Sequence, residues 1–420
     1  MSQGKAILIV SQSFFPVIGG VSSFLVGLVC GLVGLGYRVH VLHFRVRGSG
    51  RFMDLYPQVR QHDIDAATSF SATTMERYAV FKEDLYRKLH GLDPTGIGEL
   101  NAIDGYAAYR EVTEVFARHA TAIVREYEIE ILNVHDYQLF PVLDIRGCAK
   151  KLLNIHTPIL PSYPYETLQF LRRLALKADW TVVSTPAYYE VLANDQTKDI
   201  LQVTCLPPFV DNNLQRALCD AAGCNTPVPD RKFIVTSIQR FDAKSGHQQL
   251  IRGFASFVAK HPEALLVLVG GPSFTDSIAD IRHRYYQEAK DLTAALDIQE
   301  NVFFAGSVPY QCLGEVYSRT QVFCMLSRNE CFGLALTEAM SRQVPAVVTA
   351  VGGLGYQIRN GVDGVTVAVD DPAGVASALE FLHEHPALGA QYAASAYERY
   401  LDLFHPAAVM RQYDALLQSL

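Results

Sequence analysis

The 420-residue sequence has few charged residues and no long polar or repetitive tract. Asp, Glu, Lys and Arg make up 19% of it, and the formal net charge is -7 at pH 7. The absence of a basic excess excludes a general nucleic-acid-binding protein, because such affinity rests on a concentrated basic face. The absence of polar tracts argues against extended disorder. A hydrophobic fraction of 49% over this length predicts a globular protein with two domains.

Paired cysteines and membrane-length hydrophobic runs are also lacking. The cysteines form neither CxxC pairs nor a His/Cys cluster at zinc spacing, which predicts mostly buried, reduced thiols in a cytoplasmic protein. The most apolar stretch, residues 21–36, is shorter than the roughly 20 residues of a membrane span and follows a strand-like run. We interpret it as a buried first helix. The eight cysteines are Cys30, Cys148, Cys205, Cys219, Cys224, Cys312, Cys324 and Cys331.

Short apolar runs bounded by Gly, Pro or Ser recur along the chain, separated by helix-like segments. Runs without polar alternation are typical of parallel strands buried on both faces, so they predict α/β domains with doubly wound sheets. A polar, proline-bearing stretch after residue 206 separates two series of them. The first series comprises residues 5–10, 37–42, 129–134, 151–155 and 180–184; the second comprises residues 233–237, 265–269, 302–305, 322–326, 346–349 and 365–367.

The alternation breaks down between residues 45 and 100, where a helix is expected at 75–89. We interpret this region as an insertion into the first domain, such as a lid. It contains Asp63-Ile64-Asp65, which resembles a metal-binding motif of another fold but is out of place here, so no metal is expected.

The most specific segment, residues 326–340, follows one expected strand and opens a helix. Backbone N–H groups near Phe332, Gly333 and Leu334 would face outward at the helix N-terminus, where they can bind a phosphate. Glu330 and Glu338 are eight positions apart and could accept hydrogen bonds from hydroxyls of a transferred sugar and of a ribose. The simpler alternative is a helix-capping and a solvated glutamate.

A second segment, residues 237–247, also joins a strand end to a helix start. Its Arg240 and Lys244 could neutralise a diphosphate leaving group without a metal. Alone, the pair would be a solvated basic loop. Together with the glutamate segment, it indicates a nucleotide-sugar site.

These two segments resemble those of the retaining family 4 glycosyltransferases, and the resemblance extends over the whole chain. It implies the GT-B fold, with two Rossmann-like doubly wound domains facing across a cleft. The implied domains are an acceptor-side domain, 1–206, with the insertion at about 45–100 and a terminal helix at 405–420 packing back on it, and a nucleotide-sugar-binding domain, 207–404.

The resemblance also implies roles for further residues. Gly19 and Gly20 fall in the family's glycine loop, residues 16–20, and His156 falls beside the reacting sugar. Val308 falls near the nucleobase. At another strand end, His135 and Asp136 either line the acceptor side or form local hydrogen bonds.

The implied activity is retaining, metal-independent transfer of a sugar to a hydroxyl of a small-molecule or glycan acceptor. His156, Arg240, Lys244 and Glu330 would be catalytic, with the acceptor deprotonated by the leaving phosphate. No cofactor is expected beyond the nucleotide-sugar co-substrate, for which a UDP-sugar is the default. The acceptor, the donor base and the oligomeric state stay open.

The sequence departs from the family after residues 352–355, where Tyr356 and Gln357 follow instead of the usual glutamate. Cys331 stands at a position where a small residue is common, and we interpret it as space-filling. The basic amphipathic stretch 171–177 leaves membrane contact open, although an ordinary surface helix is the simpler interpretation.

Two alternatives to the implied function are kept. The first is a synthase that forms a disaccharide or sugar phosphate, with Arg45, Arg47 and Arg51 either binding an acceptor phosphate or forming a solvated loop. The second is a nucleotide-sugar-binding scaffold without catalysis, which would not need the combination of cations and glutamates.

Overall fold

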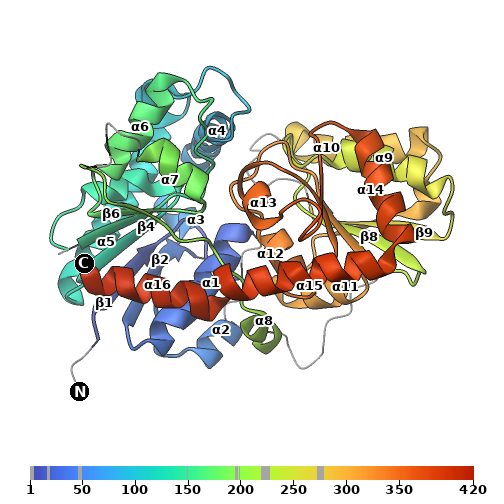
Figure 1. Ribbon diagram of the computed structural model, residues 1–420. Coiled ribbons are helices and arrows are strands. Elements are labelled where there is room, and N and C mark those ends of the chain that lie inside the picture. The colour runs from blue at the N-terminus through green and yellow to red at the C-terminus, as the bar shows by residue number, and fades with distance from the viewer. Residues whose placement is uncertain are drawn as a thin grey trace. The chain divides into compact units, whose positions relative to one another are not determined.

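The chain folds into two compact units, which the computed structural model in Figure 1 shows as two groups of strands flanked by helices. The N-terminal unit comprises Met1–Pro208 and Pro406–Leu420, and the C-terminal unit comprises Phe209–His405. The structure describes residues 4–16, 19–45, 50–148, 150–193, 197, 199–218, 228–271 and 279–420.

The N-terminal unit contains a seven-stranded parallel sheet in the order β3-β2-β1-β4-β5-β6-β7. All five side chains of β1 are buried, because helices cover both faces of the central strands. The strands are β1 (Ala6–Val10), β2 (Arg38–Phe44), β3 (Arg60–Ile64), β4 (Ile131–His135), β5 (Lys150–Asn154), β6 (Trp180–Val183) and β7 (Val203–Cys205).

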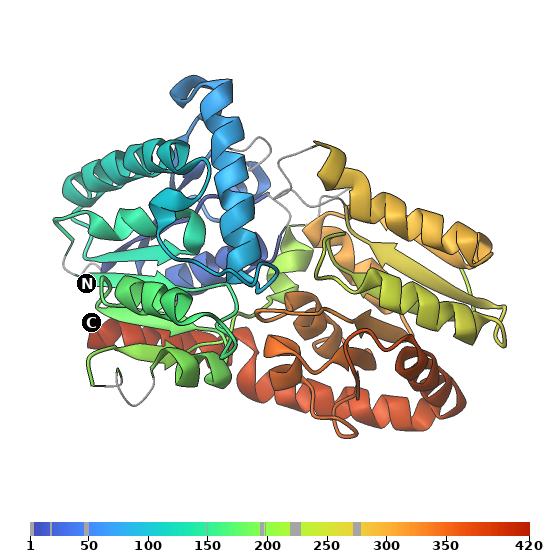
Figure 2. The same cartoon turned by 90° about the horizontal axis from the view of Figure 1, so that it is seen from above.

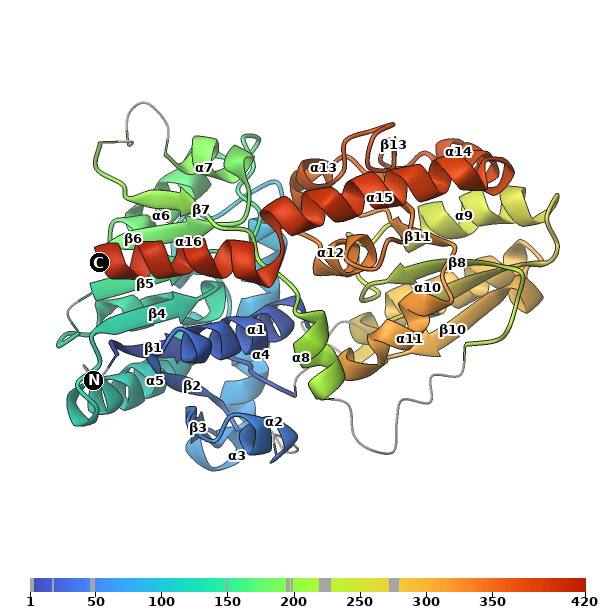
Figure 3. The same ribbon diagram turned by 60° about the horizontal axis from the view of Figure 1, so that its bottom comes forward.

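The last helix of the chain, α16 (Pro406–Ser419), packs on α1 (Gly20–Gly34), and the two run side by side in Figure 3. Tyr413 of α16 donates a hydrogen bond of 2.6 Å to Asn154 Oδ1, which joins this helix to the end of β5. The other helices of the unit are α2 (Gly50–Leu55), α3 (Ala66–Ser69), α4 (Ala72–Leu89), η1 (Leu100–Ala102), α5 (Tyr106–Glu126), η2 (Tyr137–Asp144), α6 (Tyr165–Ala175) and α7 (Pro186–Leu192).

The region expected to be an insertion, residues 45–100, contributes a strand to the sheet, because β3 within it pairs with β2 as the edge strand. Its sequence is polar since an edge strand leaves its side chains partly exposed. Asp63 and Asp65 both form ion pairs with Arg45. Arg47 and the side chain of Arg51 lie outside the described residues.

The C-terminal unit contains a six-stranded parallel sheet in the order β10-β9-β8-β11-β12-β13. Its strands are β8 (Phe233–Ile238), β9 (Ala264–Val269), β10 (Val302–Gly306), β11 (Val322–Met325), β12 (Ala346–Thr349) and β13 (Val365–Val367). Figure 2 shows helices on either side of these strands. They are α8 (Asn212–Ala217), α9 (His247–Val258), α10 (Ala279–Ala295), η3 (Gln299–Asn301), η4 (Tyr310–Cys312), α11 (Leu313–Ser318), α12 (Leu334–Met340), α13 (Gly352–Gln357), α14 (Pro372–Glu384) and α15 (Pro386–Leu403).

The expected cysteine chemistry holds only in part. Cys312 is disulfide-bonded, which corrects the prediction of a reduced thiol at that position. Cys219 and Cys224 lie outside the described residues. Among the described residues, the cysteines outside a disulfide are Cys30, Cys148, Cys205, Cys324 and Cys331. Among the helices that the structure describes, none has the length and apolar character needed to cross a membrane.

Candidate active site

The two segments that the sequence analysis identified in the C-terminal unit, residues 237–247 and 326–340, meet at the carboxyl ends of its parallel strands. One follows β8 and the other follows β11, and these strands are parallel neighbours, so their carboxyl ends lie together. The Arg328 N–H donates to the Lys244 carbonyl at 2.7 Å, and the Gln239 amide donates to Ser327 Oγ at 2.7 Å. The fold thereby joins two loops that are far apart in the sequence.

Lys244 and Glu330 form an ion pair between these loops. Lys244 Nζ lies 2.6 Å from Glu330 Oε2, and the two side chains are only 10% and 13% exposed. The Ser327 hydroxyl donates to the same carboxylate oxygen at 3.3 Å. A cation expected to contact the diphosphate and a carboxylate expected to contact the sugar are therefore adjacent and neutralise each other.

Arg240 lies beside the same loop, with its side chain 36% exposed and its guanidinium 3.7 Å from the Asp242 carboxylate. Asp242 accepts hydrogen bonds from the Lys244 N–H and the Ser245 hydroxyl, which fix the loop. Burial opposes the charge of Asp242, but Lys244 and Arg240 outweigh it and lower the pKa of this carboxyl. Asp242 was not among the predicted site residues, although an Asp that starts a loop between two basic residues is a usable signal.

The first turn of α12 lies at the same carboxyl ends of the strands. Gly333 precedes the helix with φ +90°, and a Cβ there would overlap the Leu354 side chain. The Phe332 ring is buried 5.5 Å from Phe404. Because α12 begins at Leu334, its first N–H groups have no partner within the helix and can bind an anion.

Gln357, at the end of α13, holds the turn before α12 in place through its side chain. Its side chain is fully buried, donates to the Phe332 carbonyl at 2.6 Å and accepts from Thr337 Oγ1 at 2.7 Å. Arg399 donates to the Tyr356 and Gln357 carbonyls. The Gln357 side chain thus supplies an amide donor that a carboxylate lacks.

We expect Gln357→Glu to destabilise the protein by about 1–3 kcal/mol at pH 8, because the carboxylate would face the Phe332 carbonyl as a second acceptor. At pH 5 the buried carboxyl would keep a proton and donate it, so the loss would shrink. Thermal unfolding at both pH values measures this, with Gln343→Glu at an exposed position as the matched control. Equal stability of Gln357→Glu and wild type at pH 8 would contradict the role of the amide.

Glu338 is buried rather than solvated, with 4% exposure, and accepts a hydrogen bond of 2.9 Å from the Tyr317 hydroxyl. Burial raises the pKa of this carboxyl, although Arg342 and the Tyr317 hydroxyl oppose the shift. Val308 is buried just beyond β10. Tyr317 was not among the predicted site residues, because it lies on α11 and no sequence pattern links it to Glu338 on α12.

In the N-terminal unit, His135, expected on the acceptor side, and His156, expected beside the reacting sugar, meet where β4 and β5 end. His135 ends β4 and His156 follows β5, and His135 Nδ1 lies 2.9 Å from His156 Nε2. Burial lowers the pKa of His156 to about 4 and that of His135 well below its ordinary value. Both rings are therefore neutral at pH 7, and one donates its N–H to the other. The Phe24 ring packs edge-on against His156.

Asp136 lies next to this pair in an unusual state. It is 6% exposed, its backbone has φ +68°, and its Oδ1 has no hydrogen-bond partner among the described residues. Burial raises its pKa from 3.8 to about 7. In the glycine loop, Gly19 precedes α1 and Gly20 is its first residue, whereas residues 17 and 18 lie outside the described residues.

Asp136→Asn should remove a pH dependence of stability. Between pH 4 and 7 the folded protein keeps the Asp136 proton that the unfolded chain has lost, so wild-type stability falls as the pH rises through this range. The variant should gain up to about 4 kcal/mol relative to wild type from pH 4 to pH 8. Urea unfolding across this range measures the difference.

The matched control for that measurement is Asp144→Asn, at an exposed aspartate paired with Lys177 in the same unit. Its stability relative to wild type should not drift upward with pH. The assignment fails if Asp136→Asn and wild type show parallel stability curves.

Residues 225–399 match the model of the family described as Glycosyl transferases group 1. The mannosylfructose-phosphate synthase of Agrobacterium fabrum is 29% identical over 189 residues, which cover 44% of this chain and 40% of that protein. A D-inositol 3-phosphate glycosyltransferase of Corynebacterium kroppenstedtii is 32% identical over 37% of this chain and 34% of its own length. These matches therefore span about two-fifths of each relative or less.

The trehalose synthase of Pyrococcus horikoshii is 26% identical over 76% of this chain and 78% of its own length. Among solved structures, a sucrose-phosphate synthase of Thermosynechococcus elongatus gives a TM-score of 0.72 at 19% identity, covering 99% of this chain and 98% of that one. An α,α-trehalose-phosphate synthase of Burkholderia vietnamiensis gives 0.76 at 15% identity, covering 99% and 100%. These structures confirm the predicted GT-B fold class.

Proposed function

We propose that the chain is a group 1 glycosyl transferase, the family whose model matches residues 225–399, and that it transfers a sugar from a nucleotide-diphosphate sugar to an acceptor hydroxyl with retention of anomeric configuration. The observation that carries this proposal is the pairing of Lys244 with Glu330, beside Arg240 and the start of α12. Two cations, a carboxylate and a helix N-terminus suit a sugar joined to a diphosphate.

Donor binding would separate the Lys244–Glu330 ion pair, because each side chain would bind a different part of the donor. When the diphosphate binds, Lys244 would move from Glu330 to a phosphate oxygen, which leaves Glu330 to accept hydrogen bonds from sugar hydroxyls. As the anomeric bond breaks, negative charge develops on the leaving oxygen, where Arg240 and Lys244 stabilise it. This charge compensation needs no metal.

The histidine pair and Asp136 would serve the acceptor side of the reaction. A neutral His156 can hydrogen-bond the transferred sugar without adding positive charge beside its oxocarbenium-like centre. Asp136 has an unused Oδ1 and a pKa near neutrality, so it can accept from or donate to an acceptor hydroxyl. The leaving phosphate would take the acceptor proton.

A UDP-sugar is our proposed donor, and a small sugar, sugar phosphate or cyclitol phosphate is our proposed acceptor. The Anabaena protein HepE, at 16% identity with a TM-score of 0.69, has been solved with UDP-glucose, which supports the donor. A mannosylfructose-phosphate synthase, a D-inositol 3-phosphate glycosyltransferase and a sucrose-phosphate synthase are among the similar proteins. They favour a small, phosphorylated acceptor, which was one of the sequence-based alternatives.

A donor and acceptor screen tests this proposal. UDP-, GDP- and ADP-sugars are combined with free sugars, sugar phosphates, inositol phosphate and lipid acceptors, and released nucleotide is measured. We expect turnover with a UDP-sugar and a small hydroxylated acceptor. Nucleotide-sugar binding without turnover across the panel would support the scaffold alternative, and turnover of lipid alone would reject the small acceptor.

A further inference from the structure

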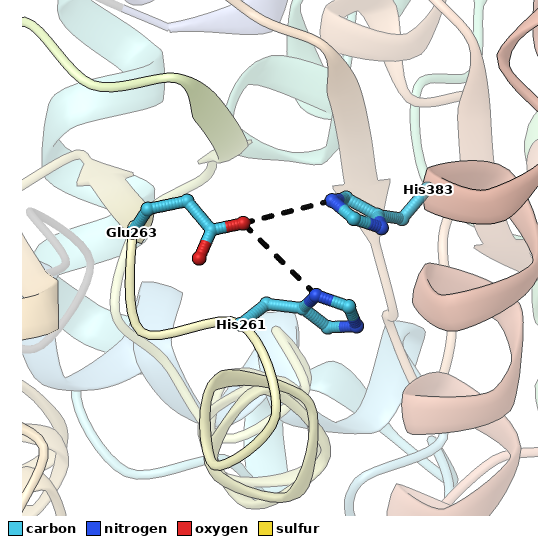
Figure 4. Close-up of side chains that lie close together, drawn as sticks. All are labelled: His261, Glu263 and His383. Carbon is cyan, nitrogen blue, oxygen red and sulfur yellow. Dashed lines mark ion pairs between the residues drawn. The ribbon is translucent and has the colours of Figure 1, made fainter.

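Three metal-ligating side chains converge at the end of α9, away from the candidate active site. His261 and Glu263 flank a proline in the turn from α9 to β9, and His383 lies in the last turn of α14 (Figure 4). Glu263 Oε1 lies 3.7 Å from His383 Nε2 and 4.0 Å from His261 Nδ1. One ligand atom from each of the three residues lies within 4.8 Å of the other two.

This group lies at the amino-terminal ends of the strands, whereas Lys244 lies at their carboxyl ends. It precedes β9, and the Phe233 ring at the start of β8 packs 4.9 Å from the His383 ring. Lys244, by contrast, follows the carboxyl end of β8. Any ligand of this group is therefore separate from the proposed transfer reaction.

The imidazole rings are held in position by neighbouring side chains. The Phe257 ring packs 4.6 Å from the His261 ring and 5.7 Å from the His383 ring. His261 Nε2 lies 3.2 Å from Glu380 Oε1, while its Nδ1 faces Glu263. This is the arrangement in which a carboxylate fixes the tautomer of a histidine that coordinates a metal through its other nitrogen.

We propose that His261, Glu263 and His383 bind one Zn²⁺ ion that fastens the α9–β9 turn to α14. Imidazole nitrogen and carboxylate oxygen are ligands that zinc takes at about 2.0–2.2 Å, which places neighbouring donors about 3.4 Å apart. The observed 3.7 and 4.0 Å, with the two histidine nitrogens within 4.8 Å of each other, would shorten by side-chain movements as the ion binds. The side chains are 17%, 40% and 28% exposed, so zinc can enter and water can take the fourth position.

The test is isothermal titration of the metal-stripped full chain with zinc chloride, together with thermal unfolding. We expect one saturable site and, at about a hundredfold excess of zinc over its Kd, a rise in Tm of about 5–10 °C. His383→Ala and Glu263→Gln should each abolish the saturable site. Glu380→Gln should weaken zinc binding about 10- to 100-fold, because it acts only through His261.

The matched control is His385→Ala, two residues from His383 and outside the group, which should bind zinc like wild type. Circular dichroism reports whether each variant is folded, and UDP binding should persist in all of them. A wild-type chain without a saturable zinc site, or His383→Ala and Glu263→Gln variants that retain it, would overturn the proposal. Zinc binding and UDP binding are read separately, so neither result decides the other proposal.

Discussion

Lys244→Ala is expected to lower kcat by about 100- to 1000-fold, the loss typical of removing one preorganised donor to a developing oxyanion. The side chain is nearly buried against Glu330, so its loss also leaves a carboxylate without its cation. We therefore expect weaker UDP binding and a lower Tm as well. Initial-rate kinetics with the donor found in the screen, alongside titration with UDP, measure these effects.

Arg252→Ala is the matched control, since it removes one exposed cation from α9 of the same unit. Its kcat should stay within about twofold of wild type, because surface substitutions away from a site change little. Folding of Lys244→Ala is checked by its circular dichroism at the assay temperature. A folded Lys244→Ala enzyme with wild-type kcat would contradict the proposed charge stabilisation.

Gly246→Ala is expected to cost about 2–5 kcal/mol of stability and to reduce transfer by displacing the Lys244 loop. Gly246 has φ +69° immediately before α9, and a Cβ there would overlap the backbone carbonyl of Leu326. The two penalties are backbone strain and a clash with an atom that cannot rotate away. Thermal unfolding measures the first effect, and kcat at a temperature where the variant is folded measures the second.

Gly361→Ala separates the two penalties. Gly361 has nearly the same φ, +70°, but a Cβ there would meet no atom within 4 Å. It should therefore lose only about 1–2 kcal/mol and keep wild-type transfer activity. If both variants lost the same stability, the close approach of Leu326 to Gly246 would not matter.

The central strands could be predicted from the sequence because burial on both faces leaves continuous apolar runs, as in β1 and β9. The edge strands β3 and β7 could not. Neither is fully buried, and β3 has four polar residues before Ile64, whose strand conformation depends on pairing with β2. Hydrophobic pattern therefore detects apolar strands, including the edge strands β10 and β13, but misses a polar edge strand such as β3.

The location of the candidate site could be predicted because its two segments follow strand ends, but its contacts could not. The Lys244–Glu330 pair joins residues 86 positions apart, and only the adjacency of β8 and β11 brings them together. Two other contacts also join residues that are distant in the sequence. The Gln357 amide donates to the Phe332 carbonyl, and the His383 ring of α14 contacts the His261 ring after α9. Such pairs have no local spacing that a sequence pattern can detect.

The central claim, retaining sugar transfer, is tested most directly by proton NMR of the product formed from an α-linked UDP-sugar. The anomeric coupling constant reports the configuration of the new bond. We predict an α-linked product, because the acceptor would attack from the face that the diphosphate leaves, guided by the charges of Arg240 and Lys244. A β-linked product would contradict this account.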